Sequence, residues 1–316
     1  MNPLSSTLID ELNHQLGPNR VLENHVLAPF TTFQIGGPAD AYFEAQTANE
    51  LSAAIKVARK LEVPFFILGL GANILVSDKG FRGLVIRNRA GNMSFSDDGI
   101  LTVESGAIVW PDVIQFSISC GYAGLEHYAG IPSTIGGALW QNLHFLSPAP
   151  ARERTMFIDE VFLDALILDP QNARREVGHD YFNFGYDQSV LHHSGDIVLS
   201  ARFQLEKGVE SILRRTVEEN LQWRSERHPP LDTEPSAGSI FKKIDGIGAG
   251  RLIDECGFKG ERIGGIEITR RHANIMINRG GGTAAEVMSM IERVQTRVKK
   301  QTGYELEPEI AFVGEF

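Results

Sequence analysis

The stretch FFILGLGANILVSDKGFRG, residues 65–83, joins two apolar runs through the glycine-rich turn 69–73. The apolar residues predict one strand before this turn and another after it. Glycine lets a backbone approach a ligand closely and adopt positive φ values. Such a turn can direct consecutive backbone N–H groups at an anion, or it can simply connect two strands.

Two familiar phosphate-binding motifs do not match this turn. A Walker loop needs Gly-Lys followed by Ser or Thr, and the turn has no such pair. A Rossmann fingerprint needs a third glycine and a following helix. Here Ile74 takes the third glycine position, and the next residues are strand-like. An anion-binding nest and a purely structural turn are the interpretations that remain.

Two further glycine-proline segments lie in the same half of the chain. They are QIGGPAD, residues 34–40, and GIPSTIGG, residues 130–137. Irregular loops rich in glycine bring backbone groups close to a ligand without side chains in between. Three such loops could surround one extended ligand, and we therefore expect a dinucleotide such as FAD.

The hydrophobic pattern predicts long helices at 48–61, 209–227 and 284–301, and a shorter one at 111–121. Thr47 with Glu50 and Thr283 with Glu286 fit capping boxes. The first 90 residues form a small α/β unit in this interpretation, and β-type runs dominate residues 100–206. We expect a domain boundary near 207–210. A strand at 305–313 would place Glu305, Glu307 and Glu309 on one face.

Composition excludes several classes of protein. The chain has 316 residues and a net charge of −10, which argues against nucleic-acid or anionic-membrane binding. Cys120 and Cys256 have no metal-ligand or disulfide spacing, so we expect no metal site. The segment MNPLSSTLID, residues 1–10, has neither a basic nor an apolar region typical of a signal peptide, and the sequence has no run of about 18 apolar residues. We therefore expect a cytoplasmic protein of about two domains.

Eight segments together resemble the UDP-N-acetylenolpyruvoylglucosamine reductase family. In chain order they are TFQIGGPAD, LGLGANILVSDKGFRGLVIRN, GLEHYAGIPSTIGG, FNFGYDQS, PSAGSIFKK, AGRLIDECGFKGERIGG, HANIMIN and LEPEIAFVG. The resemblance covers about residues 30–314. It implies an α+β fold, with an FAD-binding domain of the vanillyl-alcohol-oxidase (PCMH) type at 1–208. That domain would have two α/β lobes, about 25–90 and 91–208, and a smaller C-terminal α+β substrate domain would occupy 209–316.

The resemblance also implies the cofactor and its binding residues. FAD would be held by the three glycine segments, with its pyrophosphate over Gly69–Ile74. The cofactor-binding residues would be Gly36, Gly37, Gly69, Leu70, Gly71, Ala72, Asn73, Ile74, Gly130, Ile131, Pro132, Ser133, Thr134, Gly136 and Gly137.

The reaction implied is the reduction of an enolpyruvyl ether on a UDP-linked amino sugar, with NADPH as hydride donor, in peptidoglycan precursor synthesis. Ser239 matches the family's proton-donating serine, and Glu309 matches its catalytic glutamate. A serine hydroxyl is a weak acid, so its donation needs polarising neighbours. Tyr186, Lys242 and Lys243 are the expected substrate-binding residues. The oligomeric state is not implied.

Three departures from the family pattern put the activity in question. Asp187 stands where the family has a catalytic arginine, and Lys243 where it often has asparagine. The segment 141–148, QNLHFLSP, replaces the family's Asn-Ala-Gly-Ala-Tyr-Gly. One hypothesis is that Arg152 or Arg154 replaces the missing arginine in space. The alternatives are a paralogous flavin reductase with another substrate and a flavin-binding protein without turnover.

Overall fold

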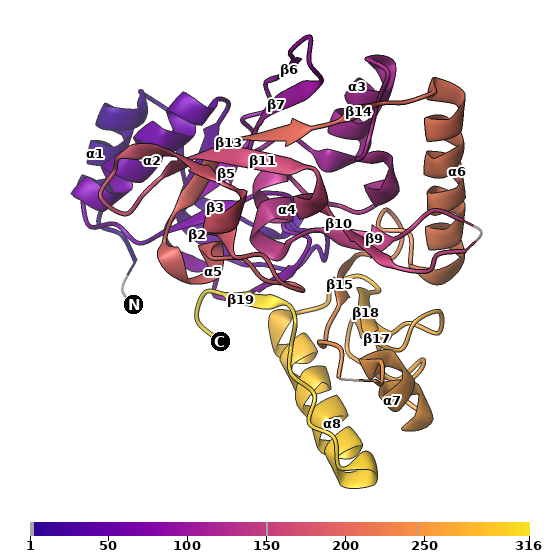
Figure 1. The fold of residues 1–316 in the computed structure, drawn as a ribbon. Coiled ribbons are helices and arrows are strands. Elements are labelled where there is room, and N and C mark those ends of the chain that lie inside the picture. Colours follow the sequence, from indigo (N-terminus) through magenta and orange to yellow (C-terminus); the bar gives the residue numbers. More distant parts are fainter. Residues whose placement is uncertain (1–2, 150, 245) are drawn as a thin grey trace.

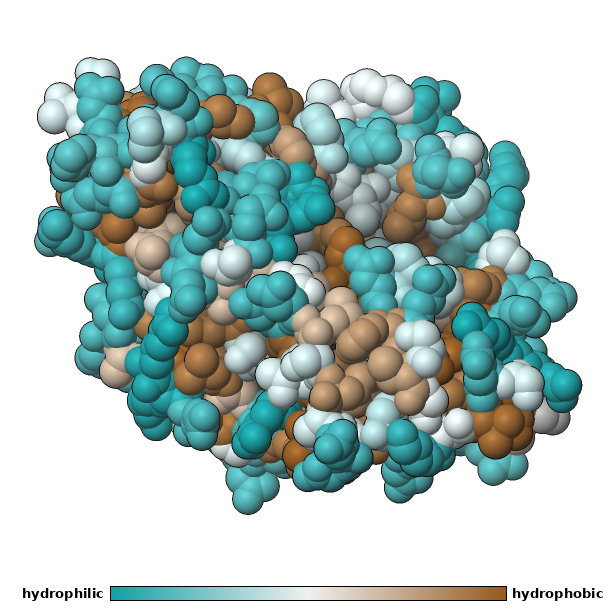
Figure 2. Space-filling view, turned by 90° about the horizontal axis from the view of Figure 1, so that it is seen from above, coloured by the Kyte–Doolittle hydropathy of each residue, from teal (hydrophilic) through white to brown (hydrophobic). Residues whose placement is uncertain are grey.

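The computed structural model describes residues 3–149, 151–244 and 246–316. It contains two lobes that are joined side by side and a C-terminal unit that lies below them in the view of Figure 1. We refer to residues 3–90 as the first lobe, 91–228 as the second lobe and 229–316 as the C-terminal unit. The N- and C-terminal ends both lie near the first lobe. Hydrophilic side chains cover much of the face in Figure 2, with hydrophobic patches between them.

The first lobe is a mixed four-stranded sheet with the strand order β1-β2-β5-β3. Strand β5 pairs in parallel with both β2 and β3, and β1 pairs antiparallel with β2. Apolar side chains of the helices bury against the sheet, among them Leu12 and Leu51. The elements are α1 (Ser6–Leu16), β1 (Val21–Val26), β2 (Pro38–Ala45), α2 (Ala48–Lys60), β3 (Phe65–Leu68), β4 (Ile74–Val76) and β5 (Phe81–Asn88).

The second lobe is an antiparallel five-stranded sheet with the order β12-β11-β13-β7-β6. Two small pairs, β9 with β10 and β8 with β14, lie outside this sheet. The strands are β6 (Met93–Phe95), β7 (Ile100–Glu104), β8 (Tyr122–Ala123), β9 (His144–Leu146), β10 (Thr155–Phe157), β11 (Phe162–Leu168), β12 (Arg174–Gly178), β13 (Ile197–Gln204) and β14 (Glu206–Lys207). The helices are α3 (Ile114–Ser119), α4 (Ile135–Gln141), α5 (Leu191–Ser194) and α6 (Glu210–Arg227). Short helical turns occupy Ala28–Phe30 in the first lobe and Val109–Val113, Glu126–Tyr128, Ile158–Glu160 and His179–Phe182 in the second.

The C-terminal unit is an antiparallel sheet, β15-β18-β17-β16, packed against two helices. One core joins Ile266 of the sheet, Leu252 of one helix and Val294 of the other. The elements are β15 (Ser236–Ser239), α7 (Ala249–Glu255), β16 (Arg262–Ile263), β17 (Ile266–Ile268), β18 (Ile275–Asn278), α8 (Ala284–Thr302) and β19 (Ala311–Val313).

The C-terminal unit is attached to the first lobe by several contacts. Strand β19 leaves the unit and pairs in parallel with β4, directly after the glycine turn. Thr32 Oγ1 donates to the carbonyl of Ser236 at 2.7 Å. Phe33 and Leu75 of the first lobe lie in the core of the C-terminal unit. The two parts therefore share one apolar core, and the glycine turn lies at their junction.

The three long helices confirm the pattern-based predictions, with ends within about a residue. The Thr283–Glu286 capping box is present. The box at Thr47 is only half formed: Thr47 accepts from the N–H of Glu50, but the Glu50 carboxylate is taken by Arg20 and by the N–H of Gln46. The expected bond from the N–H of Thr47 to the carboxylate of Glu50 is therefore not formed, and this part of the prediction was wrong.

Three other expectations need correction. Residues 111–113 belong to an irregular turn, and regular helix begins only at Ile114. The segment 130–137 is not wholly a loop, because Thr134 caps α4 and its first turn contains Gly136 and Gly137. Residues 305–310 are not a strand, so the three glutamates do not share a face. Glu305 pairs with Lys299 instead, and Glu307 with Lys242.

The domain boundary was expected at residue 208, which would place α6 in the substrate domain. Leu213 and Val217 of α6 are buried in the core of the second lobe, and Leu221 packs against that core. A helix belongs to the domain whose core buries its apolar face. We therefore propose that the division follows α6, near residue 228.

Candidate active site

The structure brings the three glycine segments together. An ideal Cβ at Gly69 would lie 2.8 Å from Thr134 Oγ1, so the first turn touches the 130–137 segment. The N–H of Thr32 donates to the carbonyl of Gly71 at 3.2 Å. Gly37 N–H donates to Ser77 at 2.9 Å and so fixes the third segment beside β4. Residues far apart in sequence thus form one surface made mainly of backbone.

The turn has unused hydrogen-bond donors. No backbone N–H from Leu70 to Asn73 donates to an acceptor in the described part of the chain. Gly71 adopts φ +61°, and a Cβ there would lie 2.8 Å from the carbonyl oxygen of Phe30. Consecutive free N–H groups in a tight turn are the pattern of an anion-binding nest. This geometry fits a pyrophosphate, and it favours the nest over the purely structural turn.

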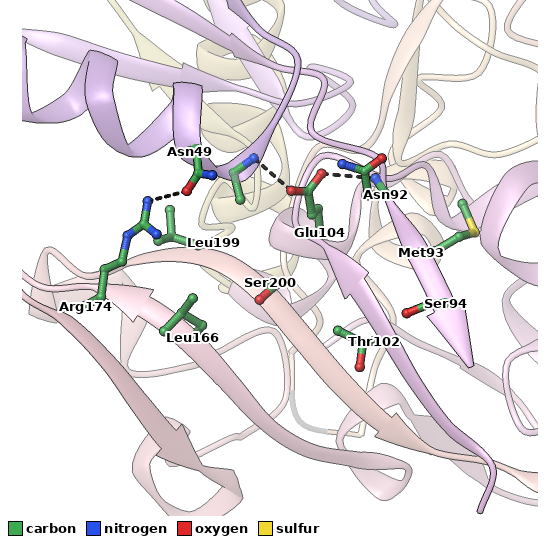
Figure 3. A pocket seen from close by; sticks show the side chains of 11 residues that line it. Asn49, Asn92, Met93, Ser94, Thr102, Glu104, Leu166, Arg174, Leu199 and Ser200 are labelled. Atoms are coloured by element: carbon green, nitrogen blue, oxygen red, sulfur yellow. Dashed lines mark hydrogen bonds between the residues drawn. The ribbon is translucent and has the colours of Figure 1, made fainter. Parts of the chain in front are cut away.

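A pocket of about 400 Å³ lies elsewhere, in the groove between α2 and the sheet of the second lobe (Figure 3). Glu104 lines this pocket, and its carboxylate accepts from the N–H groups of Ala48 and Asn92 at 3.0 Å each. At its rim, Arg174 donates to Asn49 at 2.8 Å. The residues that line it are outside the glycine segments, so this hollow is separate from the candidate site.

Ser239 and Glu309 lie on neighbouring segments of the C-terminal unit. Ser239 ends β15, and the N–H of Glu309 donates to the carbonyl of Ile240 at 2.8 Å. The side chain of Asn274 holds the next residue after Ile240, which is Phe241. The Asn274 amide donates to the carbonyl of Phe241 at 2.8 Å and accepts from the N–H of Phe241 at 3.0 Å. Asn274 therefore positions this segment, and its amide is not free for a substrate.

A loop of the second lobe reaches this segment. Gly185 and Gln188 close a tight turn, which holds Asp187 at φ +53° and exposes Tyr186. Lys243 of the C-terminal unit places Nζ 4.9 Å from the centre of the Tyr186 ring. A cation at this distance is attracted by the ring face. Tyr186 therefore joins the second lobe to the segment of Ser239 and Glu309.

The charges of this cluster perturb Glu309. Burial first and the neighbouring Asp187 second raise the pKa of Glu309, and Lys243 and Lys242 oppose them, so that the pKa comes to about 8. Burial disfavours the ionised carboxylate, and a second carboxylate adds repulsion. A group that is poised near neutral pH in this way suits proton transfer.

His144 of β9 completes the cluster. Its ring centre lies 4.5 Å from that of Tyr186, and its Nδ1 lies 3.7 Å from the carboxylate of Asp187. Burial lowers the pKa of His144, although Asp187 raises it in part. The imidazole is therefore mainly neutral at pH 7.

The two arginines expected to replace the missing guanidinium are engaged elsewhere. Arg154 forms a bidentate pair with Glu160 at 2.7 and 2.9 Å. Arg152 lies over the ring of Trp223 at 5.4 Å. Neither contact involves the Tyr186–Asp187 turn, so the structure gives no support to relocation of the arginine.

Arg224 of α6 lies beside one of the glycine segments, residues 130–137. An ideal Cβ at Gly130 would lie 3.1 Å from its Cδ. Burial lowers the pKa of Arg224 to about 10, and no carboxylate among the described residues pairs with it. The spacing of residues in α6 does not show this proximity, which depends on the packing of the helix against the second lobe.

Comparison with known proteins decides the family. Residues 229–313 match the model of the C-terminal domain of UDP-N-acetylenolpyruvoylglucosamine reductase, and residues 39–147 match an FAD binding domain. The reductase of Moorella thermoacetica is 37% identical over 296 residues, which are 94% of each chain. That of Rubrobacter xylanophilus is 38% identical over 290 residues, 92% of this chain and 94% of the relative. The chain belongs to the UDP-N-acetylenolpyruvoylglucosamine reductase family.

A solved structure of the same family agrees with the fold. The UDP-N-acetylenolpyruvylglucosamine reductase of Thermus caldophilus superposes with a TM-score of 0.75 at 31% identity, covering 93% of this chain and 99% of that chain. The α+β fold and the FAD-binding domain expected from the sequence are thus confirmed. In the described ranges, no helix has the length and apolar character needed to cross a bilayer.

Asp187, Lys243 and His144, which were identified in the sequence as departures from the family pattern, all gather around Tyr186. They come from three separate segments of the chain, so this grouping was not visible in the sequence.

Proposed function

We propose that this chain reduces UDP-N-acetylglucosamine enolpyruvate to UDP-N-acetylmuramate, with FAD as bound cofactor and NADPH as hydride source. The observation that supports this most directly is the nest of unused N–H groups from Leu70 to Asn73, within a family match of 94% of the chain. The nucleotide sugar and NADPH would both be met in the cytoplasm. The reaction serves peptidoglycan precursor synthesis.

FAD, when bound and reduced by NADPH, would supply the hydride for the β-carbon of the enolpyruvyl group. The nest of residues 70–73 would hold its pyrophosphate by backbone N–H groups. The segments around Gly36, Gly37 and 130–137 would enclose the remainder, because they meet the turn in one surface made mainly of backbone. Arg224 is adjacent to Gly130 and has no carboxylate partner among the described residues, so it would add positive charge beside an anionic cofactor.

Ser239 is the proposed donor of a proton to the α-carbon of the substrate. Its hydroxyl makes no hydrogen bond to another described residue and is therefore available to a ligand. Glu309, which keeps its own proton up to about pH 8, lies on the adjacent segment. A neutral carboxylic acid can stabilise the developing enolate by hydrogen bonding. Tyr186, Lys242 and Lys243 would contact the substrate.

An anaerobic experiment on the purified holoenzyme tests this function. NADPH should bleach the flavin absorbance, and UDP-N-acetylglucosamine enolpyruvate should restore it with formation of UDP-N-acetylmuramate, identified by mass spectrometry. Bleaching without recovery would indicate a changed or lost substrate. Bound flavin that NADPH does not bleach would indicate a flavin-binding protein without turnover.

A further inference from the structure

The cations near Glu309 differ in whether they are already neutralised. Lys242 pairs with Glu307 at 3.3 Å. Lys243 faces the Tyr186 ring at 4.9 Å and has no carboxylate within ion-pair distance among the described residues. An ammonium on a tyrosine face keeps its full charge for a further partner. Lys243 is therefore the cation of this cluster that is available to an anionic group of a ligand.

A carboxylate on the substrate needs such a partner. An isolated carboxylate loses much of its hydration in a closed site, and charge-assisted hydrogen bonds compensate for that loss. Asp187 repels a second anion, and Glu309 does so less because it holds its proton near neutral pH. Lys243 places its Nζ 4.9 Å from the centre of the ring of Tyr186, the residue before Asp187, and its charge also acts on the pKa of Glu309.

We propose that Lys243 binds the carboxylate of the enolpyruvyl group. This inference rests on the proposed function and assigns to lysine the positive charge that this chain lacks at position 187. The positive charge would then come from the C-terminal unit and not from the second lobe, with the ammonium of Lys243 over the ring of Tyr186. An ammonium binds one carboxylate oxygen as a point charge, whereas a guanidinium grips both oxygens.

Equilibrium binding to the oxidised holoenzyme tests this assignment. UDP-N-acetylglucosamine enolpyruvate carries the carboxylate, and UDP-N-acetylglucosamine does not. We expect the native chain to bind the first more tightly, and Lys243→Gln to lose most of that preference, a change of ~10–100-fold in the ratio of Kd values. Titration calorimetry measures both affinities. Lys299→Gln, an exposed lysine of the same unit that pairs with Glu305, should keep the native preference.

Further variants keep the test decisive. Lys243→Arg retains the charge and should retain most of the preference. The assignment would be overturned if Lys243→Gln still bound flavin and preferred the enolpyruvyl ligand as strongly as the native chain does. The double variant Asp187→Arg with Lys243→Asn should recover at least part of the preference, because it returns the cation to the second lobe.

The two proposals fail in different ways. If the native flavin is restored by the substrate and Lys243→Gln keeps the preference, the function stands and the role of Lys243 is wrong. If the native chain neither turns over the enolpyruvyl ligand nor prefers it to UDP-N-acetylglucosamine, both are wrong. If it prefers that ligand through Lys243 but does not reduce it, the carboxylate contact stands and the proposed reaction fails.

Discussion

At the scale of single residues, Glu309 shows most clearly how surroundings set chemistry. Glu305 and Glu309 are close in sequence, yet the pKa of Glu309 is raised to about 8 and that of Glu305 is lowered. Glu305 is exposed and paired with Lys299, which lowers its pKa. The difference comes from burial first and from Asp187 second. An acid that remains protonated at pH 7 can donate a hydrogen bond where an ordinary glutamate would repel an anion.

This account predicts a shifted pH dependence for Asp187→Asn. Removing a negative neighbour stabilises ionised Glu309, so its pKa should fall from about 8 toward the ordinary value. If protonated Glu309 is the active form, kcat/KM declines as the pH rises through that pKa. The decline should begin at lower pH in the variant, by up to about one pH unit. Burial remains, so the shift is only partial.

Steady-state kinetics from pH 6 to 10 measure this effect. Glu305→Gln is a matched control, because its carboxylate is on the surface and its removal should leave the profile unchanged. An unchanged profile in Asp187→Asn would mean that Asp187 does not control the acid.

At the scale of elements, close contacts between neighbouring backbone segments require glycine in the glycine segments. Gly37 precedes β2 and lies against the turn that joins β4 to β5, where an ideal Cβ would be 2.1 Å from the carbonyl oxygen of Asp78. The N–H groups of Gly37 and Gly80 both donate to the carbonyl of Ser77, so Gly37 and the turn cannot move apart cheaply. Such contacts explain why glycine is required at a position where the turn does not need positive φ.

Gly37→Ala should therefore destabilise the protein by about 1–3 kcal/mol or more, as other insertions into packed sites do. We expect a lower melting temperature and a lower content of bound flavin. Gly178→Ala is the matched control, because φ is −80° there and no atom lies within 4 Å of the new Cβ. Equal melting temperatures for the two variants would show that the loop adapts.

At the scale of the whole molecule, the first lobe caps a helix of the C-terminal unit. Both carboxylate oxygens of Asp78 accept hydrogen bonds from the first turn of α8, at 2.8 Å from Ala284 N and 3.0 Å from Ala285 N. A carboxylate at a helix N-terminus is favoured by its free N–H groups and by the helix dipole. These bonds and the β4–β19 pair fix the position of the glycine turn relative to the segment of Glu309.

Asp78→Ala should remove both bonds and cost about 1–2 kcal/mol. We expect faster amide exchange in the first turn of α8 and a lower melting temperature, with Asp97→Ala as a control at an exposed loop position. Native exchange rates in Asp78→Ala would indicate that the Thr283–Glu286 box alone secures the helix.

The amino-acid sequence by itself determined the local features of this protein. The three long helices follow from apolar spacing, and the glycine segments follow from composition, because both depend on residues that are near one another in the chain. The family resemblance likewise rests on short motifs in order. Positions with strong local preferences are those that sequence reasoning reads well.

Tertiary structure alone decided which of these residues act together. The core of the second lobe buries the apolar face of α6, and the strand expected at 305–313 forms only at Ala311–Val313, where it pairs with β4. Asp187, His144 and Lys243 looked like unrelated departures until the fold placed them around Tyr186. Charge and burial act through space, so the pKa of Glu309 and the free ammonium of Lys243 depend on contacts between segments that are distant in the sequence.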